Sequence, residues 1–530
     1  MSPKILKPVL INGTWRKAFS PVGSFQAVNP TKGTKLDDSY PISSFAEVEE
    51  SLEAAHEAGK ALFKTPPEGV ADFLEAFAES IEGHADELVE ISHLETALPK
   101  EPRLRSTELP RTTNQLRQAA QAARERSWCR ATIDTKANLR SKYAPLGGGI
   151  VVFGPNNFPF AFNPAAGGDF AAAVAAGNPV IAKANPGHPG TTKLFAELAF
   201  KCIKKAGLPK GTFQMIYHLR PEDGLKLVAH PLVGATSFTG GRPAGLRLKE
   251  AAEQAGKLIY LEMSSVNPIF ILPGALRERP EAIAEELFNS CALGTGQFCT
   301  KPGVFVLLHN EESKGFFGTI KKLFEQLPAG FLVGQNVLNG IEAALKAMQD
   351  AGAQIMTGGK KLEGPGFCYQ NTLLRVSGEI FLKNPKALQH EAFGTIALAV
   401  FADDFDQMTE IATALEGNLT AGIYSHTLEE DERFYSLLEP ILRRKVGRLL
   451  NDKMPTGVTV SPAMAHGGPF PASGHPGFTA VGIPASLLRF AALHCYDNVR
   501  PNRLPAELRD KNPTGRMWRM IDGEWTQRDV

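Results

Sequence analysis

At 530 residues the chain is long for one hydrophobic core and should divide into two or three domains. Its 57 basic residues almost balance 56 acidic ones, and a 43% hydrophobic content is ordinary for a globular protein, so nucleic acid is not an expected partner. The N-terminal sequence lacks a long apolar run and no stretch approaches the roughly 20 apolar residues of a membrane span, so neither a secretory signal nor a membrane partner is expected.

The first elements predicted are a hairpin and a helical region. An Asn12-Gly13 turn between two short apolar runs predicts the hairpin. Ser44 and Glu47 form a capping box before a helix expected to run through Ala58, with Gly59 placed to end it. Residues 66–125 are predicted to be mostly helical, because apolar positions recur at spacings of three and four (Phe73, Phe77, Ile81 and Leu88).

From residue 148 onward, short apolar runs alternate with amphipathic stretches. Strands are expected at 149–153, 179–183, 213–217, 234–238 and 257–262, and helices at 165–176, 189–206, 221–229 and 242–255. Such alternation predicts a parallel sheet covered by helices on both faces. It resumes with strands at 269–272 and 304–308 around a helix from Pro280, which indicates a second α/β domain.

Two further segments are extended. Residues 131–146 form a polar stretch that is either a surface loop or an oligomer contact, and the residues alone slightly favour the loop. An Asp522-Gly523 turn near the end predicts a second hairpin.

Ligands bind open parallel sheets beyond the carboxyl ends of the strands, and several polar strings fall there. Asn157 could donate an amide N–H to an oxyanion, although a plain turn asparagine is the commoner role. Lys183 could bind ribose hydroxyls or phosphate, although alone it is more simply a solvated lysine. The glycine-containing string at 238–245 would let pyrophosphate approach a helix N-terminus, with a tight turn as an equally supported alternative.

Two reactive groups complete this set. Glu262 ends an apolar run, where burial suits a carboxylate to act as a general base; the alternative is a cap on the backbone of Ser264 or Ser265. Cys299 follows two glycines that allow a ligand close to the backbone, whereas the usual fate of a lone cysteine is an inert buried thiol. A thiol with a base and an oxyanion donor is the chemistry of aldehyde oxidation through a thioester.

The remaining cysteines and histidines suggest no site. The six cysteines are scattered without paired spacing, which indicates reduced thiols and a cytoplasmic protein. No metal is expected, because His390-Glu391 lacks a second histidine and three late histidines are too dispersed (466, 475 and 494).

Together these strings resemble the aldehyde dehydrogenase superfamily, in the family's order over roughly residues 8–490. The string 155–159, Pro-Asn-Asn-Phe-Pro, is similar to its Pro-Trp-Asn-Phe-Pro, and 296–299 to its nucleophile string. The strings 391–394 and 467–474 resemble two later motifs, the second with a longer gap. The resemblance implies an α/β fold with two Rossmann-like parallel-sheet domains and a β-arm for oligomerisation. It also implies NAD(P)-dependent oxidation of an aldehyde to a carboxylic acid.

The same resemblance implies roles for individual residues and boundaries for the domains. Cys299 would be the nucleophile, Glu262 the general base and Asn157 the oxyanion donor. The cofactor would contact Phe153, Pro155, Asn156, Lys183, Asn185, Arg220, Phe238, Thr239, Gly240, Gly241, Gly245, Glu391 and Phe393. The cofactor-binding domain would comprise 1–130 and 147–265, the catalytic domain 266–470, the arm 131–146 and 471–505, and a C-terminal extension 506–530. A homodimer or homotetramer is expected.

One departure from the family concerns the cofactor. Pro186 stands where NAD-preferring members often carry a glutamate, whose charge would repel a 2′-phosphate of about −1.5 to −2. Lys183 and Arg220 could pair with that phosphate. NADP is therefore expected in preference to NAD, with dual use as the alternative.

The substrate expectation comes from the segments 111–116 and 157–169. They are similar to the branch that oxidises 2-oxoglutaric semialdehyde (2,5-dioxopentanoate), in which one relative oxidises long-chain aldehydes. Arg111 would hold a substrate carboxylate, with Gln115 and Phe160 beside it, unless Arg111 is an ordinary surface arginine. Two other classes stay open, a coenzyme A-acylating enzyme and a catalytically silent homologue; Glu262 argues against the first and the intact trio of reactive residues against the second.

Overall fold

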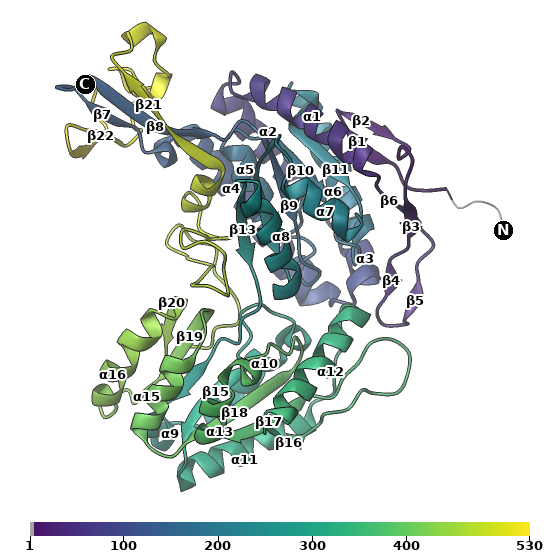
Figure 1. Cartoon of the computed structure of the whole chain (residues 1–530), viewed down its shortest axis with the longest axis vertical. Helices are drawn as coiled ribbons and strands as arrows, with labels where there is room; N and C mark the ends of the chain where they lie inside the picture. The colour runs from purple at the N-terminus through teal and green to yellow at the C-terminus, as the bar shows by residue number, and fades with distance from the viewer. Residues whose placement is uncertain (1–4) are drawn as a thin grey trace.

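The computed structural model describes residues 5–530 and shows two α/β lobes with a β-arm that projects from the first (Figure 1). Within the described residues, no helix is both long and apolar enough to cross a lipid bilayer. The lobes meet where the first sheet's last strand continues into the second sheet's first, in the middle of the chain.

The first lobe is built on a seven-stranded sheet. In spatial order its strands are β13 (Leu258–Glu262), β12 (Val233–Thr239), β9 (Gly149–Phe153), β10 (Val180–Lys183), β11 (Phe213–Ile216), β1 (Val9–Ile11) and β2 (Thr14–Arg16). The five strands from β13 to β11 run parallel, and the β1–β2 hairpin pairs antiparallel beside them, as its Asn12-Gly13 turn predicts. The strands of the parallel part are buried along most of their length, which matches their apolar sequence.

Helices cover both faces of this sheet (Figure 1). The predicted apolar stripe of the helical region is confirmed: Phe73, Phe77 and Ile81 are fully buried, and both phenylalanine rings contact Phe170 edge-on. The helices are α1 (Phe45–Leu62), α2 (Pro67–Gly83), α3 (Ala85–Thr96), the π-helical η1 (Lys100–Glu108), α4 (Leu109–Glu125), α5 (Gly168–Ala175), α6 (Pro189–Lys205), α7 (Pro221–Val228) and α8 (Arg242–Gln254).

Two of the predicted helix ends are wrong. Gly59 does not end α1; it is buried inside the helix, where an added Cβ would lie 3.3 Å from the carbonyl oxygen of Gly147, so its small size serves packing. The helix expected from residue 165 begins only at Gly168, because Asn163 organises the preceding turn by accepting a hydrogen bond from the N–H of Ala165.

The second lobe repeats the architecture with another seven-stranded sheet. Its strands in spatial order are β16 (Gln354–Thr357), β17 (Thr372–Ser377), β18 (Ile396–Ala402), β15 (Val304–Leu308), β14 (Ile269–Ile271), β19 (Asn418–Tyr424) and β20 (Val446–Asn451). Only β16 pairs antiparallel. The covering helices are α9 (Pro273–Glu278), α10 (Pro280–Ala292), α11 (Glu311–Gln326), α12 (Gln335–Asp350), α13 (Gly378–Lys383), α14 (Pro385–Leu388), α15 (Phe405–Ala414) and α16 (Glu432–Arg443).

The projecting arm is a five-stranded sheet. Its order is β21 (Ala491–Asp497), β8 (Leu139–Pro145), β7 (Thr132–Asp134), β22 (Arg519–Ile521) and β23 (Glu524–Thr526). The interpretation of 131–146 as a surface loop is therefore wrong. Its strand β8 pairs with β21, its strand β7 pairs with β22, and β7 and β8 pair with each other. The C-terminal hairpin is confirmed, and it lies parallel to β7 as part of this arm.

Candidate active site

The carboxyl ends of four neighbouring strands meet at one edge of the first sheet. Phe153 is paired in register with Lys183 and with Phe238, and Thr239 is paired with Glu262. Because parallel pairing aligns these ends, residues predicted separately from sequence converge on the cleft that faces the second lobe.

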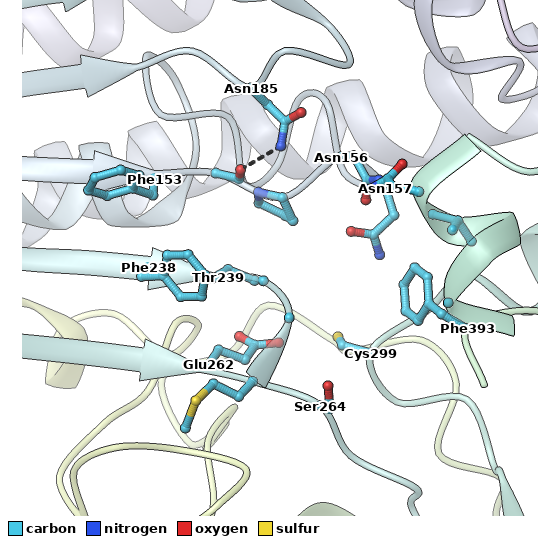
Figure 2. Close-up of a pocket in the computed structure, with 18 of the residues that line it drawn as sticks. Phe153, Asn156, Asn157, Asn185, Phe238, Thr239, Glu262, Ser264, Cys299 and Phe393 are labelled. Carbon is cyan, nitrogen blue, oxygen red and sulfur yellow. Dashed lines mark hydrogen bonds between the residues drawn. The ribbon is translucent and has the colours of Figure 1, made fainter. Parts of the chain in front are cut away.

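A cavity of about 390 Å³ opens at this edge. Figure 2 shows Cys299 between Glu262 on one side and Asn157 and Phe393 on the other. The lining includes most residues expected for the cofactor: Phe153, Pro155, Asn156, Lys183, Asn185, Phe238, Thr239, Gly240, Gly241, Glu391 and Phe393.

The loop that carries Cys299 is preceded by three residues in a left-handed backbone conformation. Gly294, Thr295 and Gly296 all have φ between 58° and 69°, which is the left-handed region that glycine favours. A Cβ on Gly296 would lie 2.1 Å from the carbonyl oxygen of Gly394, so the loop packs directly against the segment of Glu391. The side chain of Asn267 completes the support by donating to the Cys299 carbonyl at 2.9 Å.

Asn157 is held by a buried ion pair that the sequence did not suggest. Arg103, from η1, donates to the Asn157 carbonyl at 2.9 Å and pairs with the buried Glu108. Glu108 in turn accepts from the N–H groups of Phe160 and Ala161 at 2.8 and 2.9 Å. The Asn157 amide donates one N–H to the Gln297 carbonyl at 2.9 Å, which aims its NH₂ group at the nucleophile loop.

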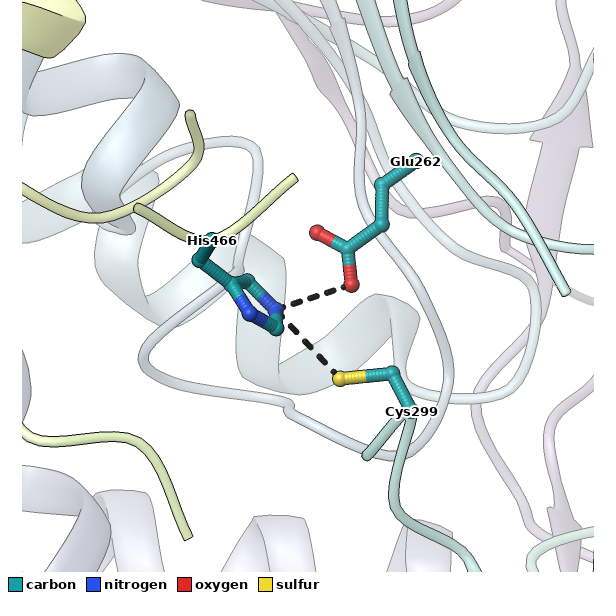
Figure 3. A group of neighbouring side chains, drawn as sticks. All are labelled: Glu262, Cys299 and His466. Carbon is teal, nitrogen blue, oxygen red and sulfur yellow. Dashed lines mark hydrogen bonds and ion pairs between the residues drawn. The ribbon is translucent and has the colours of Figure 1, made fainter. Parts of the chain in front are cut away.

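His466 joins the two reactive residues and was missed from sequence. Its Nε2 lies 3.0 Å from Oε1 of Glu262 and 3.4 Å from Sγ of Cys299 (Figure 3). It arrives on an irregular segment after β20, so no periodicity marked it; its position directly before Gly467-Gly468 was the only available signal. Glu262 and His466 are 1% and 2% exposed, so their interaction is shielded from water.

The thiol is protonated at rest. Burial raises the pKa of Cys299 well above its ordinary value, and the Glu262 carboxylate raises it further. Because the thiolate is the nucleophilic form, this sulfur needs a nearby proton acceptor, and Nε2 of His466 is within reach.

Comparisons with known proteins identify the family of this chain. The Aldehyde dehydrogenase family matches residues 15–450. The chain belongs to the aldehyde dehydrogenase family. Alpha-ketoglutaric semialdehyde dehydrogenase 2 of Azospirillum brasilense is 36% identical over 95% of this chain and 96% of that protein. An alpha-ketoglutaric semialdehyde dehydrogenase of Acinetobacter baylyi is 35% identical over 98% of each chain.

A solved structure shows the same fold. Aldehyde dehydrogenase C of Pseudomonas syringae, complexed with NAD⁺ and octanal, superposes with a TM-score of 0.79 at 21% identity, over 95% of this chain and all of that one. As a member of the aldehyde dehydrogenase family, the protein is an NAD(P)-dependent oxidoreductase that converts aldehydes to carboxylic acids. The expected α/β fold with Rossmann-like parallel sheets is confirmed.

Two features of the cavity of this aldehyde dehydrogenase suit a dinucleotide. Burial lowers the pKa of Lys183 to about 8, and within residues 5–530 no carboxylate pairs with its amine, which leaves the amine available to ribose hydroxyls or phosphate. A Cβ on Gly240 would lie 2.8 Å from the Phe238 ring, so a larger residue would crowd this turn. Arg220 and Gly245 lie outside the described lining; Arg220 is instead paired with Asp223 at 2.8 Å.

Glu391, expected at the nicotinamide ribose, lines the cavity from the second lobe. Burial raises its pKa, and the N–H of Ser265 donates to its carboxylate at 3.4 Å. The amine of Lys301, two residues after the nucleophile, donates to the carbonyls of Ala392 and Ile396 at 3.1 and 2.7 Å. Ser265, three residues after Glu262, thus contacts Glu391 directly, and Lys301, two residues after Cys299, holds the backbone that follows it.

The three expected substrate residues differ in their surroundings. Arg111 is half-buried beside the aromatic rings of Phe158 and Phe162, at 5.6 and 5.4 Å, and two of its guanidinium nitrogens are buried without a described hydrogen-bond partner. It is therefore no surface arginine. Gln115 packs against the backbone of α5 and Phe160 packs edge-on against Phe195, so the structure places both in the core of the first lobe.

Proposed function

We propose that this aldehyde dehydrogenase oxidises a short aldehyde that carries a carboxylate, with 2-oxoglutaric semialdehyde as the substrate, and that it prefers NADP. Support for the substrate comes from the buried, partly unpartnered guanidinium of Arg111. Two relatives with more than a third of their residues identical are named for alpha-ketoglutaric semialdehyde, which is the same compound.

The electrostatics of Arg111 favour an anionic ligand. Burial lowers the pKa of its guanidinium, and the negative charges of Glu108 and, more weakly, Glu262 oppose that shift, so the guanidinium is close enough to the catalytic base to sense it. Leaving guanidinium N–H groups buried without acceptors costs free energy. A substrate carboxylate would accept from both nitrogens and remove that cost.

The chemistry follows from the positions of the side chains. In the tautomer that carries its proton on Nδ1, Nε2 of His466 accepts the thiol proton of Cys299, and the new Nε2–H then faces the Glu262 carboxylate, which stabilises the imidazolium. This proton leaves to solvent before hydrolysis, which restores a neutral ring and a free carboxylate. The thiolate adds to the aldehyde carbon, while Asn157 donates a hydrogen bond to the oxygen that gains charge. A bound nicotinamide would supply the hydride acceptor. Glu262 then takes a proton from the water that hydrolyses the thioester.

The preference for NADP rests on Pro186. It lines the cavity next to Lys183 and Asn185, at the position where a glutamate would repel a 2′-phosphate. With Arg220 paired to Asp223, Lys183 is the cation that would attract this phosphate. We also propose that the protein works as a homodimer or homotetramer through its arm, in the cytoplasm, where its six free thiols would stay reduced.

Initial rates with matched aldehydes test the substrate class. The wild-type enzyme should give a higher kcat/KM for 2-oxoglutaric semialdehyde and succinic semialdehyde than for butanal and octanal. Arg111→Met should lower kcat/KM for the carboxylated aldehydes by about tenfold to a hundredfold, since hydrogen bonds to charged groups are worth roughly 1.5–3 kcal/mol. It should leave butanal oxidation almost unchanged.

Arg117→Met is the matched control, because Arg117 lies on the same helix but is half-exposed and paired with Glu82. It should behave as wild type with every aldehyde. A wild-type enzyme that oxidises octanal best would favour the long-chain alternative, and a rate that depends on coenzyme A would favour an acylating enzyme.

Parallel assays with NAD and NADP test the cofactor. Pro186→Glu should raise the KM for NADP by about tenfold or more, because like charges about 4 Å apart near a protein surface repel by up to about 4 kcal/mol. Pro186→Gln controls for side-chain size and should leave the NADP:NAD ratio close to that of wild type. Equal KM values for NADP in the two variants would contradict the assignment.

A further inference from the structure

Glu262, Cys299 and His466 present three different ligand atoms around one point. Within residues 5–530 they are the one such group of three or more acidic, thiol or imidazole side chains close enough to share a metal ion, with all three ligand atoms within 4.8 Å of one another. We propose that this trio binds Zn²⁺ and that the bound ion reversibly arrests the enzyme.

The distances match a tetrahedral zinc site. With Zn–S of about 2.3 Å and Zn–N or Zn–O of about 2.0–2.1 Å, adjacent ligands in a tetrahedron lie about 3.5 Å apart for S and N and about 3.3 Å apart for N and O. The structure has 3.4 Å from Cys299 Sγ to His466 Nε2 and 3.0 Å from that nitrogen to Glu262 Oε1. The third pair, Cys299 Sγ and a Glu262 carboxylate oxygen, lies within 4.8 Å, so side-chain shifts of up to about 1.3 Å would complete the geometry. Figure 3 shows the three side chains converging from separate segments.

The ligands are also free to coordinate. Apart from its contacts with His466 and the Cys299 thiol, which are the other two members of the trio, neither carboxylate oxygen of Glu262 has a hydrogen-bond partner among the described residues, although both are buried. Such oxygens gain from a cation. Thiolate, carboxylate and neutral imidazole together carry two negative charges, which neutralise one Zn²⁺, and the cavity lined by Cys299 and Glu262 provides entry for the ion.

Coordination needs no oxidant. The Cys299 S–H bond breaks, its proton passes to solvent, and an S–Zn bond forms without change of oxidation state. The sulfur lone pair and the Glu262 carboxylate are then both engaged, so neither nucleophile nor base is available. The arrest of turnover rests on the proposed function, whereas binding of the ion does not.

Direct binding of the metal alone tests the site. Titration of the full-length enzyme with Zn²⁺ against a chromogenic chelator should give one equivalent bound. Cys299→Ala, Glu262→Gln and His466→Gln should each weaken binding by at least about tenfold, the smallest loss typical of removing even an outer-shell partner. Co²⁺ should produce a thiolate-to-metal charge-transfer band that Cys299→Ala abolishes.

Two variants serve as matched controls. Cys495→Ser removes an exposed thiol on the arm, and His475→Ala removes an exposed histidine close in sequence to His466. Both should bind Zn²⁺ as wild type does. Circular dichroism and NADP binding of the three ligand variants would show that they are folded.

Rates measured on the same samples complete the test. Wild-type turnover should fall as the site fills and return fully with a chelator. Zinc binding that survives in His466→Gln and Cys299→Ala, or a Co²⁺ complex without a sulfur band, would overturn the proposal. An enzyme that binds zinc as described but oxidises no aldehyde would overturn the proposed function and leave the site standing.

Discussion

At the scale of single residues, reactivity depends on where the Cys299 proton goes. Burial and the Glu262 carboxylate both raise the pKa of this thiol, so few molecules hold a thiolate near neutral pH. His466 changes that outcome because its ring accepts the proton beside a carboxylate that stabilises the charged imidazole. His466 therefore contacts both Cys299, the nucleophile, and Glu262, the base.

His466→Gln should therefore slow thioester formation more than thioester hydrolysis. A missing general base typically costs about 10²–10⁴-fold in rate, so the pre-steady-state burst of reduced cofactor should slow by about that factor. Because the thiol pKa is raised, the residual rate should climb with pH as thiolate forms, over a higher pH range than in wild type. Stopped-flow fluorescence across pH would measure this, and an unchanged burst would refute the role.

Glu262→Gln should separate the two halves of the reaction. The glutamine cannot take a proton from water, so one equivalent of reduced cofactor per active site should form and turnover should then stall. Cys299→Ala, as the reference, should give no burst while it still binds NADP. Steady turnover near the wild-type rate in Glu262→Gln would exclude this carboxylate as the base.

At the scale of elements, sequence predicted the parts of the site that sit on regular structure. Asn157, Lys183 and Glu262 were found because each ends or follows a buried strand, and parallel pairing brings such ends together. His466 follows no strand or helix pattern, and the Arg103–Glu108 support depends on contacts between distant segments. Long-range packing of this kind has no local sequence signature.

Helix α6, which follows the loop of Lys183 and Pro186, also carries a titratable cap at its N-terminus. Glu95 is fully buried at the N-terminus of α6, where it accepts from the N–H groups of Gly190 and Thr191 at 2.8 and 2.9 Å. Loss of hydration outweighs these hydrogen bonds and raises its pKa from 4.5 to about 7. Its contribution to stability is therefore fully present below about pH 4.5 and is lost as pH rises through about 7.

Glu95→Gln should remove the loss of folding stability that ionisation of Glu95 causes as pH rises. Relative to wild type, the variant should gain up to about 3 kcal/mol of stability between about pH 4.5 and pH 8, because it has no carboxyl to ionise. Melting temperatures of both proteins at several pH values would measure the gain. Glu90→Gln is the control, since Glu90 lies exposed on α3, the helix that carries Glu95, and pairs with Lys100. A constant difference in melting temperature between Glu95→Gln and wild type would contradict the expectation.

At the scale of the whole molecule, the C-terminal extension belongs to the arm. The sequence predicted its hairpin from the Asp522-Gly523 turn but not its neighbour, because pairing with β7 joins segments almost 400 residues apart. Arg519 locks the extension: its buried guanidinium donates to the carbonyls of Arg509, Asp510 and Arg528 at 2.6–3.0 Å. Asp522 accepts from the N–H of Thr135 at 2.8 Å and fixes the hairpin to the arm.

Deletion of residues 506–530 should therefore expose the edge of β7. Its backbone N–H and carbonyl groups would lose their partners in β22, and an unpaired sheet edge is a template for pairing with other chains. The truncated protein should form larger, concentration-dependent assemblies, measured by size-exclusion chromatography with light scattering. Lys511→Ala, which changes an exposed side chain of the extension, should keep the wild-type mass. A truncated protein with that same mass and an unchanged melting temperature would show that the hairpin does not protect this edge.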